Sequence, residues 1–489
     1  MEVLLTSLPF AITLILLPLT AGLLCFLWPA IARILGIFTT AAGVFAVAGL
    51  GWQLQINGTL HHPIGGWGAP LGIDLYADGL SLLMLGMTAL VALAVSIYSS
   101  GYFTSRDDEI RFWPIWLLLL GALNALFLAA DIFNLYVTLE LMGLGAVALA
   151  ALSGGKQALA GAMRYLLATL LGSMCYLLGV ALLYHSFGSV DIATLAVRID
   201  SSPAVWAALG LMIAGLALKT ALFPLHFWLP PAHASAPAPV SALLSALVVK
   251  ASFYILLRLW LSIFSPQGVG DGVDTLLGLL GGIAVIWGSV QALRQTRLKL
   301  LIAYSTVAQI GYLFLAFPLA AASGGMAWNA MAYLALSHAL AKAAMFLSAG
   351  NLLRYGGHDR IADLDRVAQR LPLTAGAFAL AGVSIMGLPP SGGFIGKWLL
   401  LKAAIDQGNW AIIVVLLLGG LLAAAYIFKV LGNIFTQASH PHEPSMVPAR
   451  MEWAALLLAS GAILLSFMAS PVLELINIGD VFIANGVKS

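Results

Sequence analysis

Residues 204–228 read AVWAALGLMIAGLALKTALFPLHFW, an apolar run in which Lys219 is the only Lys, Arg, Asp or Glu. A membrane-spanning helix needs about 20 mostly apolar residues, so this run is long enough to cross a bilayer. A charged side chain at the centre of a bilayer costs at least ~2.5–3.5 kcal/mol. The stretch therefore predicts a membrane helix whose lysine has a function, because a lysine without one would be lost at no cost to the fold.

The composition of the whole chain indicates the same class of protein. Of the 489 residues, 61% are hydrophobic and 9% are charged, whereas soluble domains average about 25% charged residues. The mean hydropathy is +1.00. The formal net charge of +2 is too small to indicate a nucleic-acid partner. We therefore predict an all-α polytopic membrane protein.

Apolar stretches of similar length recur along the chain and predict about fourteen transmembrane helices joined mostly by short loops. The predicted spans are 3–28, 31–54, 79–100, 112–130, 132–152, 162–184, 204–228, 239–264, 273–293, 299–319, 327–352, 373–404, 409–436 and 452–474.

The distribution of basic residues indicates the orientation of these spans, because cytoplasmic loops carry an excess of Lys and Arg. With the N-terminus outside, the inside loops hold roughly three times as many basic residues as the outside loops. The inside loops then include Arg297, Lys299 and Arg360. This bias predicts an outside N-terminus and an even number of spans.

No pattern in the sequence predicts a cofactor or a metal site. Cys25 and Cys175 lie far apart in apolar runs and have neither metal-binding nor disulfide spacing. The segment His440-Pro441-His442-Glu443 contains metal-ligand residue types, but nothing supplies further ligands at the required spacing. We interpret that segment as a solvated loop. Nucleotide, haem and iron–sulfur motifs are not recognisable in the sequence.

Ionisable residues that fall inside the predicted spans are the candidate functional residues, and they are Glu140, Lys219, Lys250, His338, Lys342 and Lys397. Glu140 and Lys219 can face each other and share a proton or form an ion pair. His338 and Lys342 lie one helical turn apart, on one face. Titratable groups in a membrane indicate a path for a charge, and the best candidate for that charge is a proton.

Simpler interpretations of these residues stay open. Glu140 and Lys219 can form a static ion pair that only joins two helices. His338 can be a core histidine bonded to a backbone carbonyl, and Lys397 can simply stabilise a broken helix. Four other charged residues lie near span ends, where we expect solvated anchors: Asp78, Asp131, Arg164 and Lys299.

The chain also contains a weak internal repeat with an offset of 168 residues, since the segment 162–166 (AMRYL) recurs as 330–334 (AMAYL). The same offset takes the helix containing Lys219 to the region just before Lys397, and both regions are apolar helices interrupted by proline. Many transporters place a site at mid-membrane with repeated halves and interrupted helices. The backbone groups that such breaks free need partners from protein or water.

Taken together, these motifs resemble the antiporter-like subunits shared by Mrp-type cation/proton antiporters, respiratory complex I and membrane-bound hydrogenases. The resemblance covers about residues 110–436. It is carried by Asp131 to Tyr136 with Glu140, by Lys219 with Phe223 to Pro230, by Ala236 to Ser245 with Lys250, by Ala303 to Tyr312, by His338 to Lys342, and by Gly387 to Lys397. The length and the string Ala236 to Ala242 look most like the D subunit of an Mrp-type antiporter.

The resemblance implies two inverted five-helix bundles within a single membrane domain, 1–489. Its parts would be N-terminal helices (1–110), a first repeat (111–265), a second repeat (270–436) and a C-terminal helix (437–489). The resemblance also implies a relay that starts at a Glu140–Lys219 pair on the fifth and seventh helices. The relay would continue through Lys250 on the eighth helix, His338 and Lys342 on the eleventh, and Lys397 on the twelfth.

The function implied by this resemblance is proton translocation within a multisubunit Na⁺ or K⁺/proton antiporter of the bacterial cell membrane. The partners would be the other subunits of the complex and membrane lipids. Such a subunit is a secondary antiporter and not an enzyme on its own. The alternative is a proton-pumping membrane subunit of a complex I-like NADH:quinone oxidoreductase or a membrane-bound hydrogenase, where it would form part of a redox-driven translocase.

Overall fold

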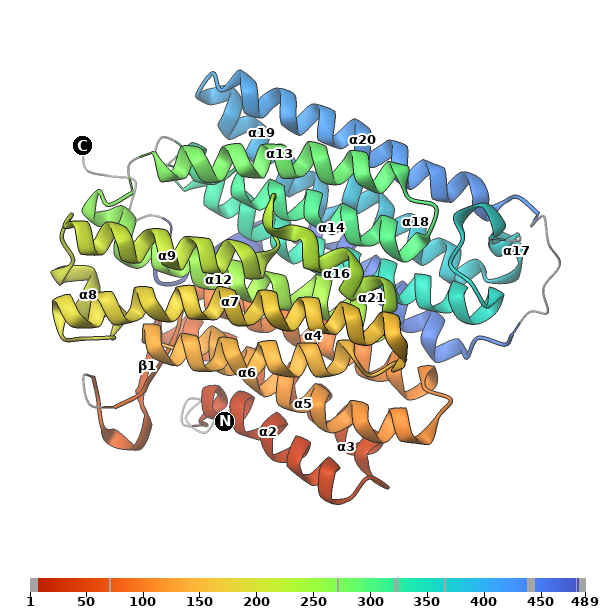
Figure 1. Ribbon diagram of the computed structural model, residues 1–489, viewed down its shortest axis with the longest axis horizontal. Helices are drawn as coiled ribbons and strands as arrows, with labels where there is room; N and C mark the ends of the chain where they lie inside the picture. The colour runs from red at the N-terminus through yellow and green to blue at the C-terminus, as the bar shows by residue number, and fades with distance from the viewer. Residues whose placement is uncertain are drawn as a thin grey trace.

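The computed structural model describes residues 8–480 apart from residues 70–71, 271, 321–322, 324, 365 and 438–444, and it also describes residue 482. Nearly all of the secondary structure is helical (Figure 1). The helices are α2 (Phe10–Leu27), α3 (Ala32–Asn57), α4 (Gly79–Tyr102), α5 (Arg106–Leu128), α6 (Ile132–Ala150), α7 (Gly155–Phe187), α8 (Ile192–Arg198), α9 (Pro203–Thr220), α10 (Leu229–Ser235), α11 (Ala238–Leu243), α12 (Val249–Leu259), α13 (Val273–Arg294), α14 (Leu298–Phe314), α15 (Phe317–Ala320), α16 (Met326–Gly356), α17 (Val367–Arg370), α18 (Pro372–Met386), α19 (Gly392–Asp406), α20 (Trp410–Ile434), α21 (Ala449–Leu464) and α22 (Ala469–Ile476).

Short elements complete the fold. The strands β1 (Leu60–Pro63) and β2 (Asp74–Ala77) pair in antiparallel register, with Leu60 opposite Ala77. The short helical turns are η1 (Ile64–Gly66), η2 (Leu225–Trp228), η3 (Leu244–Val248), η4 (Trp260–Phe264), η5 (Ser265–Gln267), η6 (Ile361–Asp363) and η7 (Leu465–Phe467). Both η3 and η4 are π-helical.

The long helices run side by side in roughly one direction (Figure 1). In that view α2, α3 and α5 lie at the bottom and α13, α19 and α20 at the top, while the strand β1 and the short helix α17 lie at opposite ends of the helices. Within the described residues, 13 helical stretches are long and apolar enough to cross a membrane. The predicted class, an all-α polytopic membrane protein, is therefore confirmed.

The twelfth predicted span, 373–404, is not one continuous helix. It consists of α18 and α19, which are separated by residues 387–391. Gly387 ends α18 with a φ of +81°, in the left-handed region that favours glycine. Pro389 and Pro390 have no backbone N–H to continue a helix. The break at these prolines was predicted, and α18 and α19 are the two halves of the interrupted stretch.

A second interruption follows Lys219. The helix α9 ends at Thr220, and Ala221 has a φ of +59°. The chain then passes through η2 to α10 and α11, with Pro237 at the junction between those two helices. Lys219 and Lys397 thus both lie near helix breaks, Lys219 in the last turn of α9 and Lys397 in the second turn of α19.

Small residues bring α7 and α9 into close contact. Gly172 and Gly215 face each other, and a Cβ atom at Gly172 would lie 2.8 Å from the carbonyl oxygen of Gly215. It would also lie 3.0 Å from Cγ of Lys219. Membrane helices commonly pack through small residues in this way. This contact sets the position of the Lys219 side chain.

Candidate functional site

Glu140 of α6 and Lys219 of α9 form an ion pair, with Nζ of Lys219 3.2 Å from Oε1 of Glu140. Ser173 of α7 donates its hydroxyl to the same carboxylate oxygen. The Lys219 side chain is 3% exposed and that of Glu140 is 21% exposed. Three helices therefore meet at one carboxylate, and the predicted proximity of Glu140 and Lys219 is confirmed.

Local structure explains why a lysine is tolerated at position 219. It lies in the last turn of α9, where the unpaired carbonyl groups favour a positive charge. Gly143, one turn after Glu140 on α6, lies close to α7, because a Cβ there would lie 2.9 Å from Oγ1 of Thr169. Lys219 thus has a counter-charge and a favourable helix end.

Lys250 is fully buried at the start of α12, directly after the π-helical turn η3. Its Nζ donates to the backbone carbonyl of Ser245 at 3.0 Å. The Ser245 hydroxyl in turn lies 2.8 Å from the hydroxyl of Thr306 on α14. A π-turn disturbs the regular hydrogen bonding of a helix and is frequent at functional sites.

His338 and Lys342 are both buried on α16, one turn apart as predicted. Lys342 donates to the carbonyl of Ile302 at 3.2 Å and to the hydroxyl of Ser305, both on α14. Neither ring nitrogen of His338 has a hydrogen-bond partner among the described residues. In the described residues His338 therefore makes no hydrogen bond to a backbone carbonyl, which was the alternative interpretation.

Lys397, which is partly buried, bridges the broken helix. Its Nζ donates to the carbonyls of Ile385 at 2.8 Å and Met386 at 3.2 Å, at the carboxyl end of α18. The ammonium also lies 4.4 Å from the ring centre of Tyr312 on α14. Lys397 thus stabilises the break, and these contacts also bring it towards the α14–α16 region.

Electrostatic contacts divide the six predicted residues into two groups. The charges of Lys250, Lys342 and Lys397 all act on His338, so these four residues form one cluster. The charge that acts on Lys219 comes from Glu140. We refer to the first group as the central cluster and to the second as the Glu–Lys pair.

Two buried residues near the central cluster were not among the six. Lys299 is 3% exposed and donates to the carbonyl of Ala236, so its prediction as a solvated anchor was wrong. His233 is fully buried on α10, and the charges of Lys299 and Lys342 act on it. The loops that cover Lys299 come from distant parts of the sequence, and its position near a span end gave no sign of them.

Two further predicted anchors are also buried, whereas Arg164 is exposed as predicted. Asp78 is fully buried and forms an ion pair with Arg258 of α12, with oxygen–nitrogen distances of 2.5 and 2.8 Å. Asp131 is mostly buried and accepts the backbone N–H of Asn134 at 2.6 Å as the N-cap of α6. His440 and His442 lie outside the described residues.

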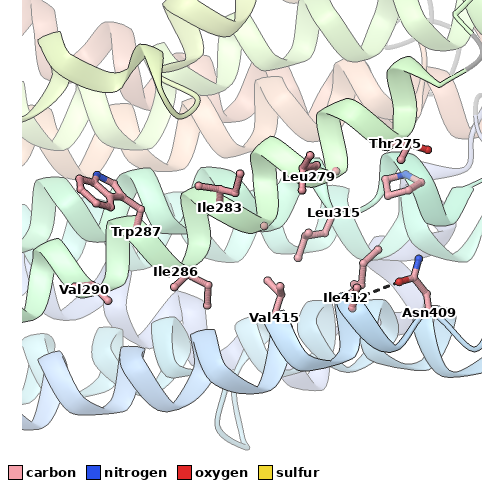
Figure 2. Close-up of a pocket in the computed structure, with 14 residues that line it drawn as sticks. Thr275, Leu279, Ile283, Ile286, Trp287, Val290, Leu315, Asn409, Ile412 and Val415 are labelled. Carbon is pink, nitrogen blue, oxygen red and sulfur yellow. Dashed lines mark hydrogen bonds between the residues drawn. The ribbon is translucent and has the colours of Figure 1, made fainter.

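An apolar groove of about 600 Å³ lies between α13 and α20 (Figure 2). It is lined by side chains such as Ile283, Ile286 and Trp287 on one helix and Ile412 and Val415 on the other. None of the residues that line it is ionisable. The groove is therefore separate from the candidate site.

Comparisons with known proteins agree with this architecture. Residues 129–423 match the family model described as NADH:quinone oxidoreductase/Mrp antiporter, TM. Residues 67–113 match the model described as NADH-Ubiquinone oxidoreductase (complex I), chain 5 N-terminus.

Individual relatives cover nearly the whole chain. The N subunit of NADH-quinone oxidoreductase from Desulforudis audaxviator is 34% identical over 476 residues, which are 94% of this chain and 92% of that protein. The D subunit of the Na⁺/H⁺ antiporter from Alkalihalophilus pseudofirmus is 27% identical over 94% of each chain. A chain in the structure of the Mrp complex from Dietzia sp. DQ12-45-1b superposes with a TM-score of 0.88 at 25% identity, covering 98% of this chain and 99% of that one. The chain therefore belongs to the NADH:quinone oxidoreductase/Mrp antiporter family of membrane proteins.

Proposed function

We propose that this chain is the proton-translocating subunit of a multisubunit Na⁺ or K⁺/proton antiporter in the bacterial cell membrane, with its N-terminus outside. The observation that carries the proposal is the central cluster, in which the ammonium groups of Lys250, Lys342 and Lys397 bond to carbonyl and hydroxyl oxygens. No carboxylate is paired with any of these three lysines among the described residues.

A cluster of this kind is suited to moving protons. Like charges repel strongly in a low-dielectric interior, so a proton added to one lysine raises the cost of a proton on the next. Whether one lysine carries a proton then controls whether its neighbours carry one. Neutral oxygen acceptors can hold either an ammonium or an amine, which a fixed carboxylate partner would not allow as easily.

In this proposal the Glu–Lys pair acts as the control element. When Lys219 is paired with Glu140, its charge is offset, and when the pair opens, an uncompensated charge faces the protein interior. Opening and closing therefore changes the electrostatic potential on the proton path. The static interpretation of the pair predicts no such coupling.

The position of Glu140 supports work in a complex with other subunits. Its side chain is 21% exposed in the middle of a helix whose outer face carries exposed apolar side chains, including Val137, Leu141 and Leu144. A carboxylate facing lipid is costly. A neighbouring subunit packed on α6 would cover it.

A second function is favoured by one observation, the 34% identity to a protein named as the N subunit of NADH-quinone oxidoreductase. In that case the same proton path would be driven by a redox partner. Isolation of the complex from native membranes, followed by mass spectrometry of its subunits, separates the two. Small membrane antiporter subunits favour the first function, and dehydrogenase or hydrogenase subunits favour the second.

The test of proton translocation uses the purified complex in proteoliposomes, with a pH-sensitive dye inside and a Na⁺ or K⁺ gradient as the driving force. We expect Glu140→Gln to lower the exchange rate at least tenfold. The matched control is Glu109→Gln, which breaks another inter-helix ion pair, Arg33–Glu109 at 2.6 Å, between α3 and α5. Equal rates in the wild type and in assembled Glu140→Gln would contradict the proposal.

A further inference from the structure

We propose that protons are taken up at a pocket behind the loop that follows α16, and that Asp359, Lys299 and His233 pass them to Lys342. The inference rests on the proposed function and adds to it a route that bypasses Glu140 and Lys219. It concerns the face that carries Arg297 and Arg360, which the basic loops predict to be cytoplasmic.

The pocket has a volume of about 660 Å³ and lies where three segments meet. These are the connection between α13 and α14, the loop from α16 to η6, and the last turns of α20. The ionisable residues that line it are Arg297, His358, Asp359, Arg360, Asp363 and Lys429. It is large enough to hold water in contact with these groups.

Asp359 lines the pocket and is only 5% exposed. Its Oδ1 accepts a hydrogen bond from Nε of Arg297 at 2.9 Å, and its backbone carbonyl accepts the N–H of Leu298 at 2.7 Å. Its Oδ2 is buried and accepts no hydrogen bond from the described residues. Buried carboxylate oxygens normally have a hydrogen-bond partner. The Oδ2 atom of Asp359 has none among the described residues, so its lone pairs are open to a proton from the pocket.

Lys299 connects the pocket to the interior. It is the second residue of α14, two residues after Arg297, and the charge of Asp359 attracts its ammonium. The Nζ atom donates to the carbonyl of Ala236, at the junction between α10 and α11. Lys299 thus lies between Asp359, which lines the pocket, and the junction of α10 and α11.

His233 continues the route. It lies three residues before Ala236, in the last turn of α10, and is fully buried. Neither ring nitrogen has a partner among the described residues. The ring stacks on Phe346 of α16, with centroids 4.7 Å apart. Phe346 is one helical turn from Lys342, and the charges of both Lys299 and Lys342 act on His233.

Each transfer on this route moves one proton between lone pairs. The protonated carboxyl of Asp359 gives its proton to the neutral amine of Lys299, which leaves a carboxylate and an ammonium. The ammonium gives it to a ring nitrogen of His233, and the imidazolium gives it to the neutral amine of Lys342. A bridging water carries the proton across any gap too long for a direct hydrogen bond.

The first experiment compares two variants that break the same ion pair. In proteoliposomes containing the complex, we expect Asp359→Asn to lower proton movement at least tenfold. Arg297→Gln, which removes the partner and keeps the carboxylate, should retain at least half of the wild-type rate. A loss only in Arg297→Gln would indicate an anion site instead. The proposal would be overturned by that result, by equal losses in both variants, or by no loss in either variant.

The second experiment blocks the pocket after folding and assembly. In a background without Cys25 and Cys175, a bulky maleimide on Ala362→Cys, an exposed pocket residue, should lower the rate at least tenfold. The same label on Gln369→Cys, exposed on α17 and outside the pocket, should have little effect. Full activity of labelled Ala362→Cys would contradict the pocket as the uptake site. A wild-type complex that moves no protons would contradict the proposed function itself, and with it this route.

Discussion

The Nζ atom of Lys397 lies 2.8 Å from the carbonyl oxygen of Ile385, so the ammonium group on one half of a broken helix binds the carboxyl end of the other half. The last carbonyls of a helix have no intrahelical partner. Lys397 supplies that partner from α19, and the break between α18 and α19 depends on it.

This contact predicts a loss of stability when the ammonium group is removed. We expect Lys397→Met to lower the free energy of unfolding by about 1.5–3 kcal/mol, the usual value for hydrogen bonds to charged groups. Lys397→Arg should retain most of the stability. Lys402→Met, at an exposed position on the same helix, is the control. Thermal unfolding in detergent measures all three, and an unchanged Lys397→Met would show that the contact is dispensable.

Lys250 should respond in the opposite way. Replacing a buried charge by an apolar residue of similar size is often neutral or stabilising, so Lys250→Leu should unfold at the same temperature as the wild type or higher. Its exchange rate should fall at least tenfold. A variant that loses stability and rate together would indicate a structural lysine.

The close contact between α7 and α9 predicts a third effect. In Gly215→Ala the new Cβ meets the carbonyl oxygen of Gly172 and forces the helices apart. We expect a loss of about 1–3 kcal/mol, as for other overpacked sites, and a roughly tenfold slower exchange, because Lys219 moves away from Glu140. In Gly210→Ala on the same helix, the Cβ would have no neighbour within 4 Å. Equal behaviour of the two variants in unfolding and exchange assays would contradict this account.

Asp131 predicts a pH dependence. Burial raises the pKa of Asp131, and the carboxylates of Asp191 and Asp74 add to the rise, while the backbone N–H groups of Asn134 and Phe133 oppose it. Folding therefore disfavours the charged form of Asp131. The loss of stability that this causes is absent below the unfolded pKa of about 3.9, and it grows as the pH rises through the folded pKa.

Asp131→Asn keeps an N-cap acceptor for α6 and removes that cost. We expect the variant to melt at a higher temperature than the wild type at pH 8, with a difference that shrinks towards pH 4. Melting curves across this range measure the effect. A variant that is less stable than the wild type at pH 8 would show that the carboxylate is favoured in the folded protein.

The sequence predicted contacts correctly where they follow from the cost of burying a charge, because that cost does not depend on how the helices pack. A carboxylate and an ammonium inside lipid need partners, and this predicted the contact between Glu140 and Lys219. Prolines 389 and 390 likewise predicted the break next to Lys397. The membrane class and the family also followed from patterns that are local in the sequence. The repeat boundaries and the relay itself stay predictions.

The sequence did not predict the contacts that bury charged residues near the ends of the spans. Asp78 and Arg258 are 180 residues apart, and each lies near the end of a predicted span, where a charge can equally well be solvated. Lys299 is buried because the carbonyl of Ala236 and the loop at Asp359 surround it. Position along a span indicates depth in the membrane but gives no information about the loops above it.

The ion pair of Arg258 with Asp78 has a mechanical consequence. It anchors one end of α12 to α4, and Tyr254 adds a hydrogen bond to the carbonyl of Phe127 at 2.9 Å. At the other end, the π-turn η3 holds a surplus residue just before Lys250. The helix is thus tethered at Arg258, about two turns from Lys250, so a twist of the backbone at η3 would move Lys250 relative to a fixed point.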